Sequence, residues 1–268
     1  MTTALRAAMF VLAVLAALAS AQADERPQLE VLPKSVLLEG PESSEQLLVF
    51  LPAEETGRVD ATRDAQYVVS PAGVIDVTSS GGVTPLTDGR AELRVSAGGR
   101  ETTIAVEVRG VVSPAPVSFR GELTPIFSKA GCNSGGCHGK AEGQNGFKLS
   151  VFGHDPAADF EAIVLQARGR RVFPAAPDHS LLLAKATAQI PHGGGQKIER
   201  DSRWYRQLRR WIAEGVAFDQ AASQPAVGIS VEPAELTLAA LGAQQLRVVA
   251  VDGQGRNRSV TAEAVFQS

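Results

Sequence analysis

The spacing of the apolar residues changes between residues 111 and 118, and this change divides the chain into regions that need different folds. Before it, polar and apolar residues alternate over short runs, which is typical of half-buried β-strands. After it, apolar residues recur at helical spacing, at Phe119, Leu123, Ile126, Phe127 and Ala130. The Pro-rich residues 112–117 between them indicate a linker. Together with the length of 268 residues, this change predicts two or three modest domains rather than one.

Residues 28–111 contain six runs that predict strands, and clusters of Gly, Pro, Asp and Ser separate them. The runs are residues 29–32, 46–50, 67–69, 74–77, 91–95 and 103–108. Many short strands with such turns predict a β-sandwich. No cysteine falls in this region, so no disulfide can join its sheets.

Residues 118–219 predict a helical region with Gly-rich loops. Beyond the helix that starts near Phe119, short helices are expected over 158–166 and 180–188. A last helix, capped by Asp201 or Ser202 and ended by Gly215, has one apolar face, made of Trp204, Leu208, Trp211 and Ile212.

After a second linker at 220–226, residues 227–268 return to a strand pattern. Strands are expected over 228–231, 235–238 and 245–251, followed by 259–261 and 265–266. These runs predict a second β-rich region.

The first residues predict a signal peptide over 1–23. Arg6 precedes the apolar run Ala7–Ala19, which is too short to cross about 30 Å of hydrocarbon, and Ala21-Gln22-Ala23 gives a cleavage site. Export to the periplasm or the cell surface follows, with an uncleaved membrane anchor as the alternative. No later segment predicts a membrane span.

Charge is unevenly distributed along the mature chain. Residues 24–117 carry 8 Lys and Arg against 15 Asp and Glu, whereas residues 118–219 carry 14 against 10. A basic middle beside an acidic flank predicts surfaces with different partners. The basic excess is small and lacks interleaved aromatic residues, so nucleic acid is not predicted.

The only two cysteines lie in Gly131-Cys132-Asn133-Ser134-Gly135-Gly136-Cys137-His138-Gly139. In c-type haem attachment, two thiols add across the haem vinyl groups and the histidine after the second cysteine ligates the iron. The spacing here is C-x-x-x-x-C-H, two residues longer than the usual C-x-x-C-H, and Gly135-Gly136 would let the longer loop bulge outward. Cys132 and Cys137 are therefore candidates for the haem thioethers, and His138 for the proximal iron ligand.

The order of a helix, the cysteine motif, loops and a Trp-bearing helix is that of small monohaem cytochromes c. Residues 118–219 resemble planctomycete cytochrome c-like domains that occur beside group 2 bacterial Ig-like domains. The strings that carry this resemblance are 130–140, 143–150, 169–171, 191–195 and 210–212. Residues 28–111 resemble a group 2 Ig-like domain, through Val77–Ser80, Asp88–Ala91 and Thr103–Val108, and residues 227–268 resemble the opening half of a second.

The resemblance implies a multidomain chain, all-β plus all-α. An Ig-like β-sandwich would be followed by a small helical haem domain and a partial Ig-like domain. The implied cofactor is one covalent haem c, with no known reaction attached to it.

Methionine is excluded as the sixth iron ligand, because Met1 and Met9 both lie in the predicted signal peptide. His192, in a Pro-His-Gly-Gly-Gly loop just before the last helix, is the main candidate; His179 and His154 are the others. The glycines allow backbone close to a haem face.

Three arginines, Arg168, Arg170 and Arg171, form a basic cluster that would pair with haem propionates. A solvated surface run is the alternative interpretation.

Three functions fit these patterns. The first is an exported electron-transfer module whose basic surface docks an acidic redox partner. The second is a non-redox cell-surface interaction protein with a Cys132–Cys137 disulfide, in which the Ig-like domains bind extracellular partners. The third is a zinc site made of both cysteines, His138 and a further histidine. An enzyme is not favoured, because the sequence has no nucleophile elbow, H-E-x-x-H motif or phosphate loop.

Overall fold

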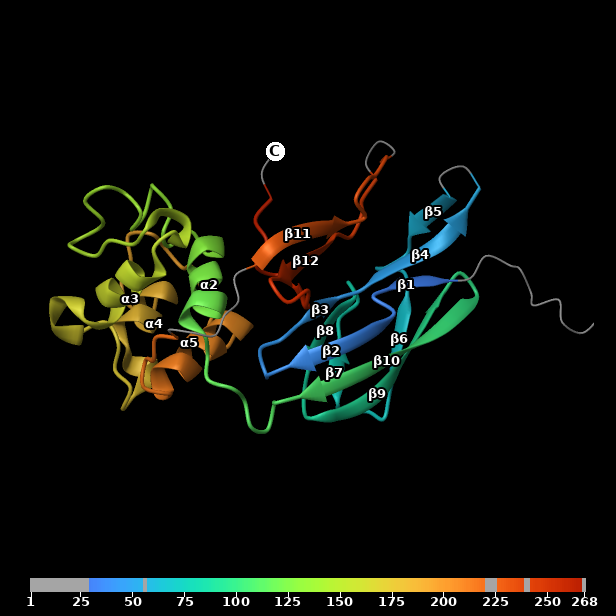
Figure 1. Ribbon diagram of the computed structural model, residues 1–268, viewed down its shortest axis with the longest axis horizontal. Helices are drawn as coiled ribbons and strands as arrows, with labels where there is room; N and C mark the ends of the chain where they lie inside the picture. The colour runs from blue at the N-terminus through green and yellow to red at the C-terminus, as the bar shows by residue number, and fades with distance from the viewer. Residues whose placement is uncertain (1–28, 55–56, 220–225, 239–241, 267–268) are drawn as a thin grey trace, which may run out of the picture.

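The computed structural model describes residues 29–54, 57–219, 226–238 and 242–266. The predicted signal peptide and most of the linker at 220–226 lie outside the described residues. The chain is a mixed α/β structure with a β-rich N-terminal region, a small helical middle and a C-terminal three-stranded sheet (Figure 1).

The N-terminal region has three small sheets. Their strand orders are β1-β4-β5, β2-β10-β9-β6 and β3-β8-β7, and every pair is antiparallel except the parallel pair of β2 and β10. The strands are β1 (Glu30–Leu32), β2 (Ser35–Glu39), β3 (Glu45–Gln46), β4 (Leu48–Ala53), β5 (Gly57–Asp60), β6 (Gln66–Ser70), β7 (Ile75–Val77), β8 (Gly82–Pro85), β9 (Gly89–Ala97) and β10 (Arg100–Arg109).

Alternation along these strands directs one set of side chains into a single core. In β2, Val36 and Leu38 are buried while their neighbours are exposed, and they pack with Val31, Leu93 and Val106 from β1, β9 and β10. The structure places strand residues in all six predicted runs. The strands β2, β5 and β8 are additional; they are five residues long or shorter.

The helical middle is built around two helices that meet in an aromatic core. Ser118 caps a π-helical turn at Phe119–Leu123, which continues as α2 (Thr124–Lys129). Ser202, rather than Asp201, caps α5 (Arg203–Ala213), with its Oγ accepting from the Tyr205 amide. The ring centroids of Phe119 and Trp211 lie 5.4 Å apart, and both residues are fully buried.

Two further helices and three 3₁₀ turns complete this part of the described chain. They are α3 (Pro156–Val164), α4 (Leu181–Ala186) and the 3₁₀ turns Val151–Gly153, Gln166–Gly169 and Pro177–His179. The predicted helices are thus confirmed. Compared with the predicted ranges, α3 begins and ends two residues earlier, and α4 is three residues shorter. Tyr205 replaces Trp204 as a buried member of the α5 face.

The C-terminal sheet contains β11 (Ala226–Glu232), β12 (Arg247–Asp252) and β13 (Asn257–Ser259), all antiparallel. The strand predicted at 235–238 is wrong, and of the segments 259–261 and 265–266 only Ser259 lies in a strand. Leu236 and Leu238 are exposed, as are Val265 and Phe266. An alternating pattern becomes a strand only where a neighbour completes the hydrogen-bond ladder, and no described segment does so here.

Charged side chains join the three parts. Arg210 on α5 binds the Glu42 carboxylate with Nε–Oε1 and Nη2–Oε2 distances of 3.2 and 2.6 Å. Arg203 on the same helix contacts Ser44 and pairs with Glu263, which follows β13.

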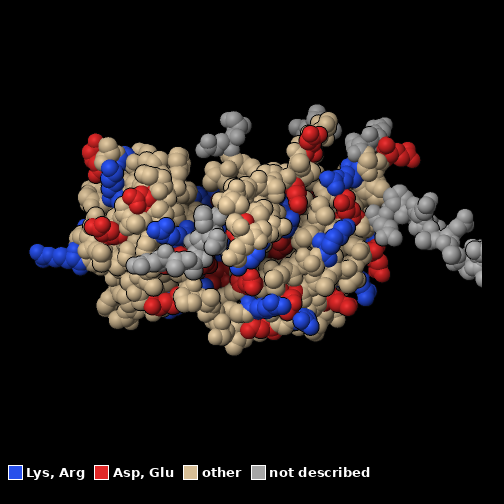
Figure 2. Space-filling view, viewed as in Figure 1, with Lys and Arg blue, Asp and Glu red and all other residues tan. Residues whose placement is uncertain are grey.

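On the face that Figure 2 shows, basic and acidic side chains are interspersed, without a large area of one sign. Among the described residues, no helix is long and apolar enough to span a membrane.

The Arg210 pair gives a test of how the parts are held together. Arg210→Gln would leave the Glu42 carboxylate, whose side chain is only 7% exposed, without its cation. We expect the free energy of unfolding to fall by about 3 kcal/mol in urea titrations. Arg209→Gln is the matched control one residue away, because Arg209 pairs with Asp178 in the open and should lose less than about 1 kcal/mol. If both variants lost the same free energy of unfolding, the Arg210–Glu42 pair would contribute no more to stability than a surface ion pair.

Candidate functional site

The cysteine motif forms a compact loop directly after α2. The Cys132 amide donates to the Phe127 carbonyl (2.8 Å), and the His138 amide donates back to the Cys132 carbonyl (3.0 Å). Asn133 is buried within the loop, and its Nδ2 donates to Ser128 Oγ (2.9 Å). These bonds close the six-residue interval from Cys132 to Cys137 into turns and place the His138 side chain beside both cysteines.

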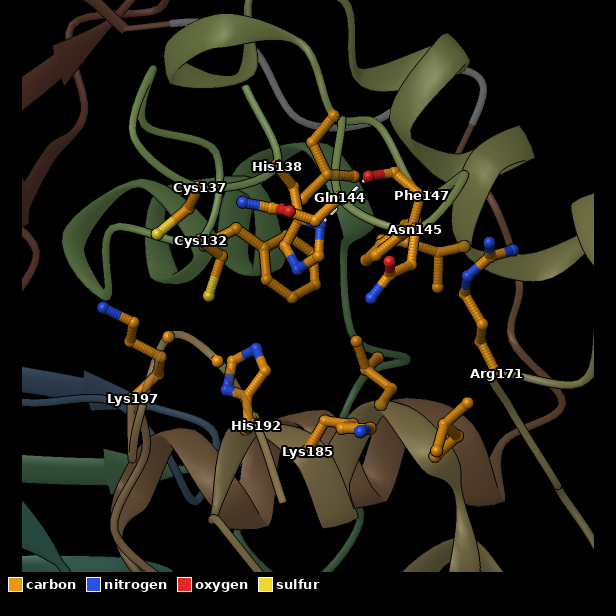
Figure 3. Close-up of a pocket in the computed structure, with 18 of the residues that line it drawn as sticks. Cys132, Cys137, His138, Gln144, Asn145, Phe147, Arg171, Lys185, His192 and Lys197 are labelled. Atoms are coloured by element: carbon orange, nitrogen blue, oxygen red, sulfur yellow. Dashed lines mark hydrogen bonds between the residues drawn. The ribbon is translucent and has the colours of Figure 1, made fainter. Parts of the chain in front are cut away.

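A cavity of about 550 Å³ lies between this loop, residues 144–149, α4 and residues 190–198. Its volume falls in the range of roughly 300–1,000 Å³ that is usual for small-molecule and cofactor sites. Its apolar wall is formed by Phe127, Phe147, Leu149, Ile163, Leu181, Leu182, Ala186, Ile190, Ile198 and Leu208. Figure 3 shows the polar side chains that enter it from several segments far apart in the sequence.

Two imidazoles face each other across this cavity (Figure 3). The ring centroids of His138 and His192 are 6.3 Å apart, and their planes differ by only 12°. Two imidazoles that ligate one metal from opposite sides, with metal–nitrogen distances of about 2.0–2.1 Å as in zinc sites, would have centroids roughly 6 Å apart. The spacing therefore suits a metal held between them.

Backbone carbonyls occupy the other nitrogen of each ring. His138 Nδ1 lies 3.0 Å from the Phe147 carbonyl oxygen, and His192 Nδ1 lies 2.7 Å from that of Gly195. A carbonyl can only accept, so in the neutral form of each ring Nδ1 carries the hydrogen and Nε2 keeps its lone pair. In most metal sites, a hydrogen bond of this kind, at the ring nitrogen that does not bind the metal, orients the histidine ligand.

Burial favours uncharged forms of the reactive groups. It lowers the pKa of His138, with smaller contributions from His192 and Arg171, against the opposing effect of the Phe147 hydrogen bond. Burial also raises the pKa of the Cys132 thiol to about 11. Near neutral pH, His138 is thus a neutral imidazole and Cys132 a protonated thiol.

Both cysteines line the cavity on the same side (Figure 3). Cys132 and Cys137 are free thiols, so the alternative disulfide is not formed in this structure. The zinc interpretation lacks its ligand set, because no three His, Cys, Asp or Glu side chains among the described residues gather closely enough to hold a metal ion.

The three predicted arginines have different positions. Arg170 and Arg171 line the cavity, whereas Arg168 is exposed and does not. Arg171 is only 4% exposed and donates to the carbonyls of Ala162, Gln166 and Gly146. It is thus largely engaged by the protein itself, while Arg170 has no such contacts.

Sequence reasoning missed two further cations, Lys185 and Lys197. Lys185 follows Leu181 by one helical turn on α4, so the predicted helix could have placed both on one face. Its Nζ donates to the Pro191 carbonyl (2.5 Å) and so contacts the loop that carries His192. Lys197 lies five residues after His192 in the same loop.

The four cations have no acidic counterpart in the cavity wall: no Asp or Glu is among the described residues that line it. An apolar cavity with cations and no carboxylate suits a ligand with an apolar body and anionic groups.

The two remaining histidines, His154 and His179, lie outside the cavity. His154 is exposed beside Val151, His179 ends a 3₁₀ turn, and neither lines the cavity.

The residue types that line the cavity could hold a covalently attached haem. Two thiols on one side of the cavity suit thioether formation, two opposed imidazoles suit axial ligation, and the cations suit propionates.

The tight cysteine loop gives a test within this site. A Cβ on Gly139 would lie 2.1 Å from the Asn133 carbonyl oxygen, whereas a Cβ on Gly135 would meet nothing within 4 Å. Gly139→Ala must therefore open the loop, and we expect a loss of about 3 kcal/mol in the free energy of unfolding, the upper end for overpacked sites. Gly135→Ala should change it by less than about 0.5 kcal/mol, as surface substitutions do. Urea titrations of both variants measure the difference, and an unaffected Gly139→Ala would contradict the loop geometry.

Comparison of the chain with protein-family models gives no match, and comparison with curated proteins gives none either. The site has a geometry of its own to indicate what binds there. That geometry combines two thiols, two metal-competent imidazoles and four cations around one apolar cavity.

Proposed function

We propose that this chain is an exported c-type haem-binding protein that transfers electrons through one covalently attached haem. Cys132 and Cys137 form the thioethers, His138 is the proximal iron ligand and His192 is the distal one. The observation that carries the proposal is the pair of imidazoles, 6.3 Å apart and nearly parallel, in the same cavity as the two thiols.

Two histidine ligands determine what the chain can do with the iron. Bound haem supplies a one-electron iron couple whose potential depends on axial ligands and burial. His138 and His192 would hold the iron through Nε2 in both oxidation states, and the hydrogen bonds of their Nδ1 atoms to backbone carbonyls would keep both rings in place. Such a site favours electron transfer over substrate activation, which needs an open position.

The cations have a separate task. Arg170, Lys185 and Lys197 reach the cavity without carboxylate partners in its described wall. They can neutralise the propionates with charge-assisted hydrogen bonds. Arg171 adds a fixed positive charge, although its guanidinium already donates to three carbonyls. Arg168 lies outside the cavity wall and would act only at longer range.

The architecture supports a finer division of the chain. We assign residues 28–111 to an Ig-like β-sandwich, 118–219 to a cytochrome c-like domain and 227–268 to part of a second Ig-like domain. Three sheets that share one core support the first assignment. The order of α2, the cysteine loop and the Trp211-bearing α5 supports the second. Residues 1–23 as a signal peptide would deliver the chain to the periplasm or cell surface, where Ig-like domains commonly bind partners and an acidic redox protein would meet the haem domain.

Haem attachment is tested with the full chain, expressed in cells with a periplasmic cytochrome c maturation system. We expect a c-type reduced pyridine haemochrome spectrum that stays with the protein after extraction in acidified acetone. The double variant Cys132→Ser/Cys137→Ser should lose all of this extraction-resistant haem, because no thiol remains to bond the vinyl carbons. A colourless wild type, in cells where a control cytochrome matures, would overturn the proposal. If it also lacked free thiols, the interaction protein with a Cys132–Cys137 disulfide would replace it.

Distal ligation is tested by His192→Ala. Removing the imidazole leaves an open iron position, so we expect the reduced protein to bind carbon monoxide at least about tenfold more tightly than wild type, which must first release His192. Absorbance titration in the Soret region measures this change. His154→Ala is the matched control, because that histidine is exposed and outside the cavity. Equal carbon monoxide affinity in wild type and His192→Ala would exclude His192 as a ligand.

A further inference from the structure

Arg171 is the most buried cation in the cavity wall, and its contacts are unusual. Its guanidinium is enclosed, but no carboxylate pairs with it among the described residues. Instead, Nη1 donates to the carbonyls of Ala162 and Gln166 at 2.9 and 3.1 Å, and Nη2 donates to that of Gly146 at 3.4 Å. Burying a charge without a counterion is costly, so a planar cation in this position indicates a specific task.

These contacts join the end of α3 to the turn at residues 144–147. The turn closes with two backbone hydrogen bonds of 2.9 Å between Gln144 and Phe147. Arg171 holds it from outside, through the Gly146 carbonyl and through the Phe147 ring, whose centroid lies 4.4 Å from the guanidinium carbon. Cation–π contact and hydrogen bonding thus act on adjacent residues of one turn.

The same turn determines the orientation of His138. The Phe147 carbonyl accepts the hydrogen of His138 Nδ1, and the Phe147 ring lies 4.5 Å from the His138 ring, centroid to centroid. Phe147 therefore contacts His138 through its carbonyl and ring, and contacts Arg171 through its ring. A shift of the 144–147 turn would move the acceptor away from Nδ1.

We infer that Arg171 is a positioning residue that clamps the 144–147 turn, so that the Phe147 carbonyl keeps the hydrogen on His138 Nδ1 and leaves Nε2 free to bind metal in the cavity. That Nε2 binds metal rests on the proposed haem function, whereas the tautomer of His138 can be measured in the haem-free chain. Lysine does not replace Arg171, because its compact ammonium lacks the planar fork whose two Nη groups reach separate carbonyls while the guanidinium lies over the Phe147 ring.

The alternative is that Arg171 contributes only its charge. Arg170 provides the control, because it lies next in sequence, lines the same cavity and has no hydrogen bond to the turn. Arg170→Gln removes one positive charge and leaves the clamp intact. Arg171→Lys keeps the charge and removes the clamp.

The experiment measures the His138 tautomer in the haem-free full chain by long-range ¹H–¹⁵N NMR at pH 8, where a histidine with an ordinary pKa near 6.5 is neutral. His138→Asn assigns the signal. We expect wild type and Arg170→Gln to carry the hydrogen on Nδ1. Arg171→Gln and Arg171→Lys should shift toward a mixture with Nε2, and hydrogen exchange at the Phe147 amide should become roughly tenfold faster as the turn loosens.

Phe147→Leu keeps the carbonyl and removes the ring, so it tests the clamp if the Arg171 variants fail to fold. We expect it to produce a smaller shift toward the mixture. An unchanged Nδ1 tautomer in folded Arg171→Lys and Phe147→Leu would overturn the inference, and so would an equal shift in Arg170→Gln. A wild-type chain that takes up no haem would instead defeat the proposed function and leave the tautomer result standing.

Discussion

The hydrogen bond from His138 Nδ1 to the Phe147 carbonyl connects two loops that contain little regular secondary structure. Without a helix or a sheet ladder, such loops must satisfy their buried backbone groups through turns and side chains. Arg171 does so at the Gly146 carbonyl of the 144–147 turn, and the Asp159 carboxylate does so at Ser150, accepting from its amide and its hydroxyl. The geometry of the site therefore depends on a few buried polar contacts.

Helix α5 relates this site to the rest of the chain. Its apolar face packs Trp211 against Phe119 and presents Leu208 to the cavity. Its polar face carries Arg203 and Arg210, which bind residues of the two β-parts. One short helix is thus shared by the hydrophobic core, the cavity wall and the contacts between parts. Any ligand that displaced Leu208 would have to move side chains on which those contacts depend, so the cavity is expected to be rigid on this side and to adapt through its loops.

The sequence predicted the features that depend on residues close together in the chain. Helical spacing identified α2 and α5, alternation identified most strands, and the adjacency of Cys137 and His138 identified the cavity loop. Contacts between distant residues were not predictable in this way. The clamp at Arg171 depends on carbonyls that only the fold brings together, and a run of arginines looks the same whether it is solvated or buried. The strand predicted at 235–238 was wrong for a related reason, because its alternating residues have no described neighbour with which to pair.

Charge in the cavity follows from these contacts and limits what can bind there. Arg171 is stabilised by carbonyl dipoles, which offset part of its desolvation but leave its net charge. Arg170, Lys185 and Lys197 remain partly exposed, so their charge is partly screened by solvent. A neutral apolar ligand would cover these cations and desolvate them without compensation. A ligand with carboxylates at one edge would compensate them, and the low local dielectric would strengthen each pair. We therefore expect the cavity to bind amphipathic anions more tightly than neutral apolar molecules of the same size.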